Sequence, residues 1–146
     1  MKKIMLAFII FIISFTSVSA QGQPKKALLA MENTKFKSVL IEDMKKELES
    51  RSVEVTVVSD HKTDLNNYKA SDFDYVFITN SGVNSKVRPW VQKWITDNGN
   101  RKNILLHTTK IKEWQENVSV DAVSSASLRK DISPLAKEYA DLLLMR

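Results

Sequence analysis

Residues 25–48 read KKALLAMENTKFKSVLIEDMKKEL and carry the clearest structural signal in this 146-residue chain. Residues 27–30 form an apolar run of strand length, and residues 32–34 form a polar corner. After the corner, apolar side chains recur at three- and four-residue spacing, which predicts an amphipathic helix capped by Asn33 or Thr34. The side chains expected on its buried face are Phe36, Val39, Leu40, Met44 and Leu48. A second apolar strand at residues 53–58 completes a parallel βαβ unit.

The N-terminus has the pattern of a secretory signal peptide. Lys2 and Lys3 precede an apolar run at residues 4–15, and residues 18–20 (VSA) form a small-residue cleavage site. An uncleaved membrane anchor would need a longer apolar run of about 20 residues. We therefore expect residues 1–20 to be removed and residues 21–146 to form one periplasmic or secreted domain. No later segment is apolar enough to predict a membrane span.

Composition excludes several classes of site. The formal net charge is +5, two units of which belong to Lys2 and Lys3, and the other charges alternate in sign without a basic stripe. Nucleic-acid binding is therefore not expected. The chain has no cysteine and only two histidines, His61 and His107, so neither a disulfide nor a zinc site is expected.

The rest of the chain alternates strands with helices. Further strands are predicted at residues 74–79, 103–109 and 118–123, with a link at residues 110–117 that is too short for a packed helix. The segment at residues 59–73 is expected to be a loop with one helical turn. One helix is predicted to end at Asn98-Gly99, and its buried side chains are Val87, Trp90, Val91, Trp94 and Ile95. A last helix is predicted to begin near Asp131 or Ser133, and its buried side chains are Leu135, Tyr139, Leu142 and Leu143. Five strands with three helices predict an open α/β sheet covered on both faces.

These elements resemble the flavodoxin-like family over most of the mature domain. The resemblance rests on their order and on the segments DLNNYKASDFDYVFITNS (residues 64–81) and VRPWVQKWI (residues 87–95). Trehalose-utilisation-type and glutamine-amidotransferase-like domains share part of this pattern. The flavodoxin-like resemblance implies a three-layer α/β sandwich with a five-stranded parallel sheet in the order 2-1-3-4-5, here with a reduced set of helices. In the family's redox members it also implies bound flavin mononucleotide (FMN).

The corner at residues 31–35 departs from the family's pattern for binding the FMN phosphate. A flavodoxin holds this phosphate in a Ser/Thr-rich corner that contains a glycine, whereas this chain has MENTK, where only Thr34 and more loosely Asn33 match. Glu32 adds a negative charge that would repel a phosphate dianion. We therefore expect no cofactor. If FMN does bind, the resemblance places Thr34, Asn80, Ser81 and Trp114 in contact with it.

Hydroxyl and amide side chains gather at the predicted carboxyl ends of the strands, where ligands of such folds bind. They are Asn33, Thr34, Asn80, Ser81, Thr108, Thr109, Ser124, Ser125 and Ser127, with Lys35, Lys86 and Lys110 nearby. This edge could hold a small polar or anionic ligand, but Ser, Thr and Asn also populate turns and helix caps in any α/β protein. The edge has no paired carboxylates, and its serines have no evident His–Asp partner, so no catalytic residue is predicted.

Two further residues and one segment in this region have alternative interpretations. A lone strand histidine such as His107 is typically packed rather than catalytic, and Trp114 either stacks on a flavin or covers the short link as a hydrophobic lid. The segment DAVSSAS, residues 121–127, is similar to the signature of domains that carry flavin on a threonine through a phosphoester. Here Ser125 replaces the glycine of that signature and Ser127 replaces the acceptor threonine.

The sequence thus predicts an exported flavodoxin-like domain that acts as a non-catalytic binding or interaction module of the cell envelope. Its expected partner is a small polar ligand or another envelope protein. The alternative is an FMN-binding electron-transfer protein or flavin-dependent reductase that uses the same edge of the sheet.

Overall fold

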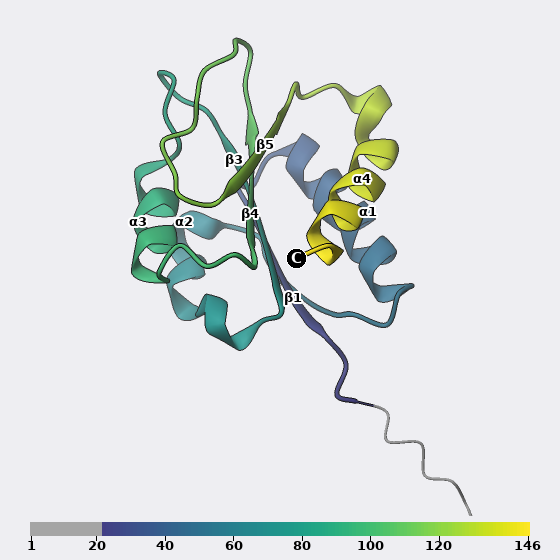
Figure 1. The fold of residues 1–146 in the computed structure, drawn as a ribbon. Coiled ribbons are helices and arrows are strands. Elements are labelled where there is room, and N and C mark those ends of the chain that lie inside the picture. Colours follow the sequence, from purple (N-terminus) through teal and green to yellow (C-terminus); the bar gives the residue numbers. More distant parts are fainter. Residues whose placement is uncertain (1–21) are drawn as a thin grey trace, which may run out of the picture.

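Five parallel strands form the sheet that organises residues 22–146, the part of the chain that the computed structural model describes (Figure 1). The strands are β1 (Lys26–Met31), β2 (Glu54–Val58), β3 (Tyr75–Ser81), β4 (Ile104–Thr109) and β5 (Asp121–Ser125). Their order is β2-β1-β3-β4-β5, which confirms the predicted flavodoxin-like topology. The predicted signal peptide, residues 1–20, lies outside the described residues.

Helices cover both faces of this sheet (Figure 1). On one face lie α1 (Lys35–Glu49) and α4 (Ile132–Leu144), which pack side by side, and on the other lie α2 (His61–Asp64) and α3 (Pro89–Asp97). Short 3₁₀ turns occupy Leu65–Asn67, Ala70–Asp72 and Arg129–Asp131. Residues 59–73, where one helical turn was expected, contain α2 and the first two of these 3₁₀ turns. No helix joins β4 to β5.

The helix ends follow local sequence rules. Thr34 caps α1, because its Oγ1 accepts a hydrogen bond of 3.4 Å from the backbone N–H of Lys37. Gly99 follows α3 in the left-handed region at φ +73°, a conformation that glycine adopts without a side-chain clash, as the Asn98-Gly99 pair predicted.

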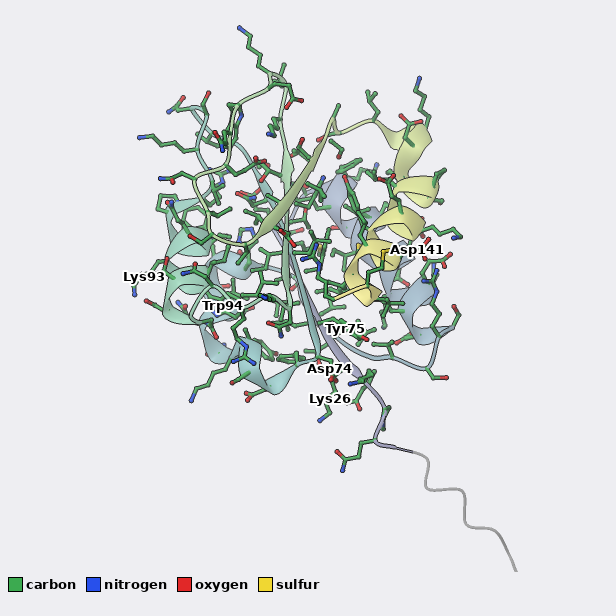
Figure 2. All side chains as sticks on the ribbon, viewed as in Figure 1. Lys26, Asp74, Tyr75, Lys93, Trp94 and Asp141 are labelled. Carbon is green, nitrogen blue, oxygen red and sulfur yellow. The ribbon has the colours of Figure 1, made fainter. Side chains whose placement is uncertain are left out.

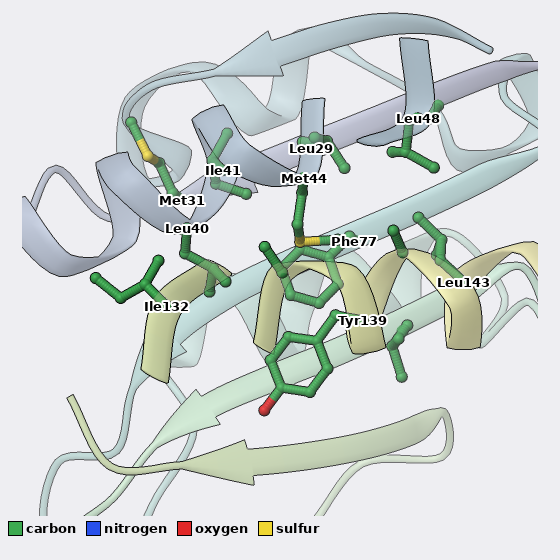
Figure 3. Packing of buried hydrophobic residues seen from close by; sticks show 14 of the residues in the cluster. Leu29, Met31, Leu40, Ile41, Met44, Leu48, Phe77, Ile132, Tyr139 and Leu143 are labelled. Atoms are coloured by element: carbon green, nitrogen blue, oxygen red, sulfur yellow. The ribbon is translucent and has the colours of Figure 1, made fainter. Parts of the chain in front are cut away.

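The core has two halves because side chains alternate across the sheet. Phe77 faces α1 and α4 and is fully buried against Met44 and Tyr139 (Figure 3). Its neighbours Val76 and Ile78 point to the opposite face, where they are buried with Trp94 of α3. The continuous apolar run of β3 is therefore explained by burial on both faces.

The buried face of α1 is rotated relative to its prediction. Val39 is 42 % exposed, whereas Ile41 is buried and Lys37 is only 2 % exposed. The expectation that Val39 lies in the core was therefore wrong. The helix is rotated because this orientation turns Lys37 inward, where its ammonium contacts Ser81 and Glu32 at the end of the sheet.

The position of β5 also differs from its prediction at residues 118–123. Its register is set by β4, with Leu105 opposite Asp121 and Thr109 opposite Ser125. Val118 and Val120 instead lie before the strand and pack against the core half under α3. Their apolar character therefore reflects packing on the sheet face rather than pairing at its edge.

The amino edge of the sheet is closed by polar contacts around Asp74. Its carboxylate accepts hydrogen bonds from the backbone N–H of Lys26 (2.8 Å) and from Lys25 Nζ (2.9 Å), and Figure 2 shows Asp74 beside Lys26 where the N-terminal segment enters the fold. Among residues 22–146, no helix has the length and apolar character needed to cross a membrane.

Candidate functional site

Charged and hydroxyl side chains converge at the carboxyl edge of the sheet. Glu32 follows β1, Ser81 ends β3, Thr109 ends β4, Lys37 comes from the start of α1, and Arg88 immediately precedes α3. We refer to Glu32, Lys37, Ser81, Arg88 and Thr109 as the Glu32 cluster. Parallel strands bring these residues together because all their carboxyl ends meet at one edge.

The Glu32 carboxylate is the centre of this cluster. One oxygen, Oε2, accepts a hydrogen bond of 2.7 Å from the backbone N–H of Ser81 and lies 3.3 Å from Lys37 Nζ. The other oxygen, Oε1, accepts a hydrogen bond from Arg88 Nε. Burial alone would raise the pKa of Glu32, but the Ser81 hydrogen bond and the two cations outweigh burial and hold the pKa below its usual value. The carboxylate is therefore ionised at neutral pH.

Lys37 supplies a buried ammonium group. Besides its ion pair with Glu32, Nζ donates hydrogen bonds to Ser81 Oγ (2.8 Å) and Thr109 Oγ1 (3.3 Å), so each of its three N–H groups has an acceptor. Burial lowers the pKa of Lys37, and the neighbouring Glu32 carboxylate partly offsets this effect. The ammonium thus contacts the carboxyl ends of the three central strands, β1, β3 and β4.

Asn80 faces the opposite side of the sheet from Ser81 and has a structural role. Its Nδ2 donates to the backbone carbonyl of His107 (3.1 Å) and to Thr108 Oγ1 (3.0 Å), and its Oδ1 accepts from the backbone N–H of Arg88 (3.1 Å). The side chain is fully buried. Asn80 therefore fixes the β3–α3 loop and so helps to place Arg88 beside Glu32.

His61 lies beneath the same edge, at the start of α2. Its Nδ1 accepts a hydrogen bond of 3.0 Å from Trp90 Nε1, so the hydrogen of the neutral ring is on Nε2. Nε2 is buried and has no hydrogen-bond partner within residues 22–146. Burial lowers the pKa of His61 to about 4, although Glu32 and Asp60 oppose the shift. The ring is thus neutral under physiological conditions.

His107 belongs to a separate buried network under α4. Its Nδ1 lies 2.7 Å from Thr79 Oγ1, its Nε2 lies 2.8 Å from Ser125 Oγ, and its ring lies 4.9 Å from that of Tyr139. Ser125 thus has a histidine partner that the sequence did not reveal. Burial, with a smaller effect from Lys37, lowers the pKa of His107 to about 3, which makes this imidazole a weak general base. Among residues 22–146, no carboxylate is hydrogen-bonded to the ring. Its hydrogen bonds instead join β3, β4 and β5.

Trp114, in the segment between β4 and β5, packs over Gly82. A Cβ atom on Gly82 would lie 2.4 Å from the indole, so glycine is needed for this close approach. Lys110 Nζ lies 4.9 Å from the centre of the ring and donates to the Trp114 carbonyl (2.7 Å). The indole therefore covers the end of β3 as a hydrophobic lid.

The predicted flavin contacts lie in different environments. Ser81 joins the Glu32 cluster, Thr34 caps α1 at an exposed position, Asn80 is buried, and Trp114 packs over Gly82. Among the other candidates, Thr109 is in the cluster and Thr108 is bonded to Asn80.

Sequence reasoning missed Lys37, Arg88 and the role of His61. Lys37 has a detectable signal, because it precedes Leu40, Ile41 and Met44 by three, four and seven residues on one helix face. Arg88 has no such signal, since its position depends on the loop that Asn80 fixes. Within residues 22–146, no group of three or more His, Cys, Asp and Glu side chains is arranged to hold a metal ion.

Solved structures with similar folds include a flavodoxin from the Archaea. It matches with a TM-score of 0.55 and 13 % identity over 82 % of this chain and 99 % of the flavodoxin. A response regulator receiver domain protein from Bacillus halodurans has a TM-score of 0.55 and 12 % identity over 83 % of this chain and 97 % of its own. A mutant flavo di-iron protein from Thermotoga maritima has a TM-score of 0.59 and 11 % identity over 85 % of this chain but only 36 % of its own.

These likenesses establish a flavodoxin-like fold for this chain. No protein-family model matches the sequence. No curated protein matches it at a significant level.

Proposed function

We propose that this chain is an exported flavodoxin-like domain that acts as a non-catalytic binding module of the cell envelope. The observation that carries the proposal is the environment of Glu32. Its carboxylate is held by the Ser81 N–H, Lys37 and Arg88 at the corner where the flavodoxin-like resemblance places the FMN phosphate.

The Glu32 cluster disfavours FMN for two reasons. The carboxylate already uses the cations and the backbone donor that an incoming phosphate would need, and its own charge repels a dianion. In addition, the corner at residues 31–35 has no glycine to bring backbone N–H groups close to the phosphate. The alternative, an FMN-dependent electron carrier or reductase, draws its support from the fold shared with an archaeal flavodoxin.

Flavin titration tests the choice between these functions. Purified protein should lack the yellow flavin absorbance and should not quench the fluorescence of FMN at micromolar concentrations. Riboflavin should be titrated in parallel, because it lacks the phosphate on which the argument depends. Glu32→Thr should raise FMN affinity only weakly, because it removes the repulsion and frees Lys37 and Arg88 but leaves the glycine-free backbone unchanged.

Glu113→Gln is the matched control for the loss of one carboxylate. Glu113 lies near the same edge, but its side chain is 92 % exposed and its carboxylate is 3.7 Å from Lys110 Nζ, so this variant should leave flavin binding unchanged. A yellow wild-type protein, or FMN binding with micromolar affinity, would establish the alternative. Thr34, Asn80, Ser81 and Trp114 would then be the first contacts to mutate, and loss of tight binding in Ser127→Ala alone would indicate phosphoester attachment.

A further inference from the structure

A groove of about 460 Å³ lies beside the Glu32 cluster, between the ends of β3, β4 and β5. It is lined by Ser81, Gly82, Thr109, Lys110, Ile111, Ala126 and Ser127. Its volume is in the range of small-molecule sites. We propose that this groove binds a small organic carboxylate, with the carboxylate on the Ser81 and Thr109 hydroxyls and the apolar body against Ile111 and Ala126. This inference rests on the proposed function as a binding module and names its ligand class.

The groove presents hydroxyl hydrogens that lack good acceptors among the described residues. Ser81 Oγ accepts a hydrogen bond from Lys37 and donates none within residues 22–146. Thr109 Oγ1 also accepts from Lys37, and the acceptors within its own reach, the Asn80 carbonyl and Ser81 Oγ, are 3.4 and 3.5 Å away. These distances exceed the usual O–H···O range of about 2.5–3.0 Å. Both hydroxyls can therefore donate to an oxygen atom in the groove.

Charge selects an anion as the acceptor. The ammonium of Lys37 contacts both hydroxyls, so it polarises their O–H bonds and favours a negative ligand atom. The ionised side chains of the Glu32 cluster are two cations and one carboxylate, which leaves a formal charge of +1 beside the groove. Lys110 adds little to this charge, because its Nζ lies 3.0 Å from a carboxylate oxygen of Glu116.

The apolar part of the groove favours an organic ligand over a simple inorganic anion. Ile111 is fully exposed although its side chain is large and apolar, and it lines the groove together with Ala126. An apolar ligand body would remove part of the Ile111 side chain from water, which contributes roughly 25 cal/mol for each Å² buried.

Binding of hexanoate, 1-hexanol and inorganic phosphate tests each part of this inference. Amide chemical shifts of the isotope-labelled chain should move at Gly82, Thr109 and Ser127 on addition of hexanoate. Hexanol lacks the carboxylate and phosphate lacks the apolar body, so each should bind at least tenfold more weakly. Equal affinities for hexanoate and hexanol would overturn the role of the hydroxyls and Lys37, and equal affinities for hexanoate and phosphate would overturn the role of Ile111.

Variants separate the two halves of the groove. Thr109→Val keeps the side-chain shape but removes the hydroxyl, and it should weaken hexanoate binding about tenfold, with Ser81→Ala as a second variant if the first does not fold. Ile111→Ser should weaken hexanoate binding several-fold but leave phosphate unaffected. Val57→Ser is the control, because it makes a similar apolar-to-serine change at a β2 side chain that is 38 % exposed and lies outside the groove.

The FMN titration shows whether a negative result overturns the carboxylate site alone or the proposed function as well. Absence of hexanoate binding and of FMN binding would overturn the carboxylate site while leaving the non-flavin binding module in place. Micromolar FMN binding would overturn the proposed function, whatever hexanoate does. Hexanoate binding that survives both hydroxyl variants would place the ligand elsewhere and so refute the site.

Discussion

A lysine that is only 2 % exposed depends on its partners, because an uncompensated buried charge is costly. Lys37→Met removes the ammonium and leaves Glu32 with only Arg88 and one backbone donor, so we expect the free energy of unfolding to fall by on the order of 3 kcal/mol. Glu32→Gln in the same chain removes the unbalanced carboxylate. The double variant should therefore be more stable than the sum of the single losses by at least about 1 kcal/mol, as measured by urea denaturation. Strict additivity would mean that the two side chains do not interact.

The two buried histidines make stability depend on pH. Both have folded-state pKa values far below 6.5, about 4 for His61 and about 3 for His107, so below pH 6.5 the unfolded chain binds more protons than the folded one. Their contribution is present above pH 6.5 and is lost as pH falls toward these folded values, by about 1.4 kcal/mol per pH unit for each histidine. Denaturant melts at pH 7, 6 and 5 should show this decline, and His61→Gln or His107→Gln should make it shallower. A stability that is constant from pH 7 to pH 5 would contradict burial of both rings.

At the scale of the elements, β3 connects the two halves of the core. Phe77 is fully buried in the middle of this strand, between β1 and β4 and under the ring of Tyr139. Phe77→Ala should lower the free energy of unfolding by about 3–5 kcal/mol, the range for large core truncations. Val57→Ala on β2, at a side chain that is 38 % exposed, should cost much less. A loss of only a few tenths of a kcal/mol for Phe77→Ala would mean that the core around β3 is loosely packed.

The elements were more predictable than their rotation and register. Apolar periodicity located four of the strands and the main helices, because burial dictates that pattern. The same periodicity misplaced β5. Val118 and Val120 are apolar because they pack under α3, and the residues that pair with β4 have no distinctive composition. The rotation of α1 was missed because a lysine at a core position is read as solvent-facing unless its partner is known.

At the scale of the whole molecule, the position of the candidate site was predictable but its internal contacts were not. Ser81 and Thr109 were expected at the carboxyl edge because strand order places them there. Side-chain alternation puts Asn80 and Ser81 on opposite faces, and only the packed sheet shows which of them meets Lys37. The contacts of Glu32 with Ser81 and Arg88 join positions 49 and 56 residues apart, so no local pattern encodes them.

Export remains a prediction for the whole chain. Lys2 and Lys3, the apolar run and the VSA site predict cleavage after Ala20. Sequencing of the N-terminus of protein from its native cell should begin at or near Gln21, which can cyclise. Recovery of the full-length chain from the cytosol would show that the segment is not a working signal peptide.

The packing of α4 on α1 also bears on the timing of synthesis. In chain order α4 follows all five strands of the sheet, yet it supplies Ala136, Tyr139 and Leu143 to the core half that contains Phe77. A ribosome that adds about 5–20 residues per second makes this helix after all five strands, so the face of the sheet beneath it stays open until α4 has been made. The nascent chain therefore cannot complete its fold before α4 leaves the ribosome. Under the export that we propose, it would reach a protein-conducting channel in a form that can still be threaded.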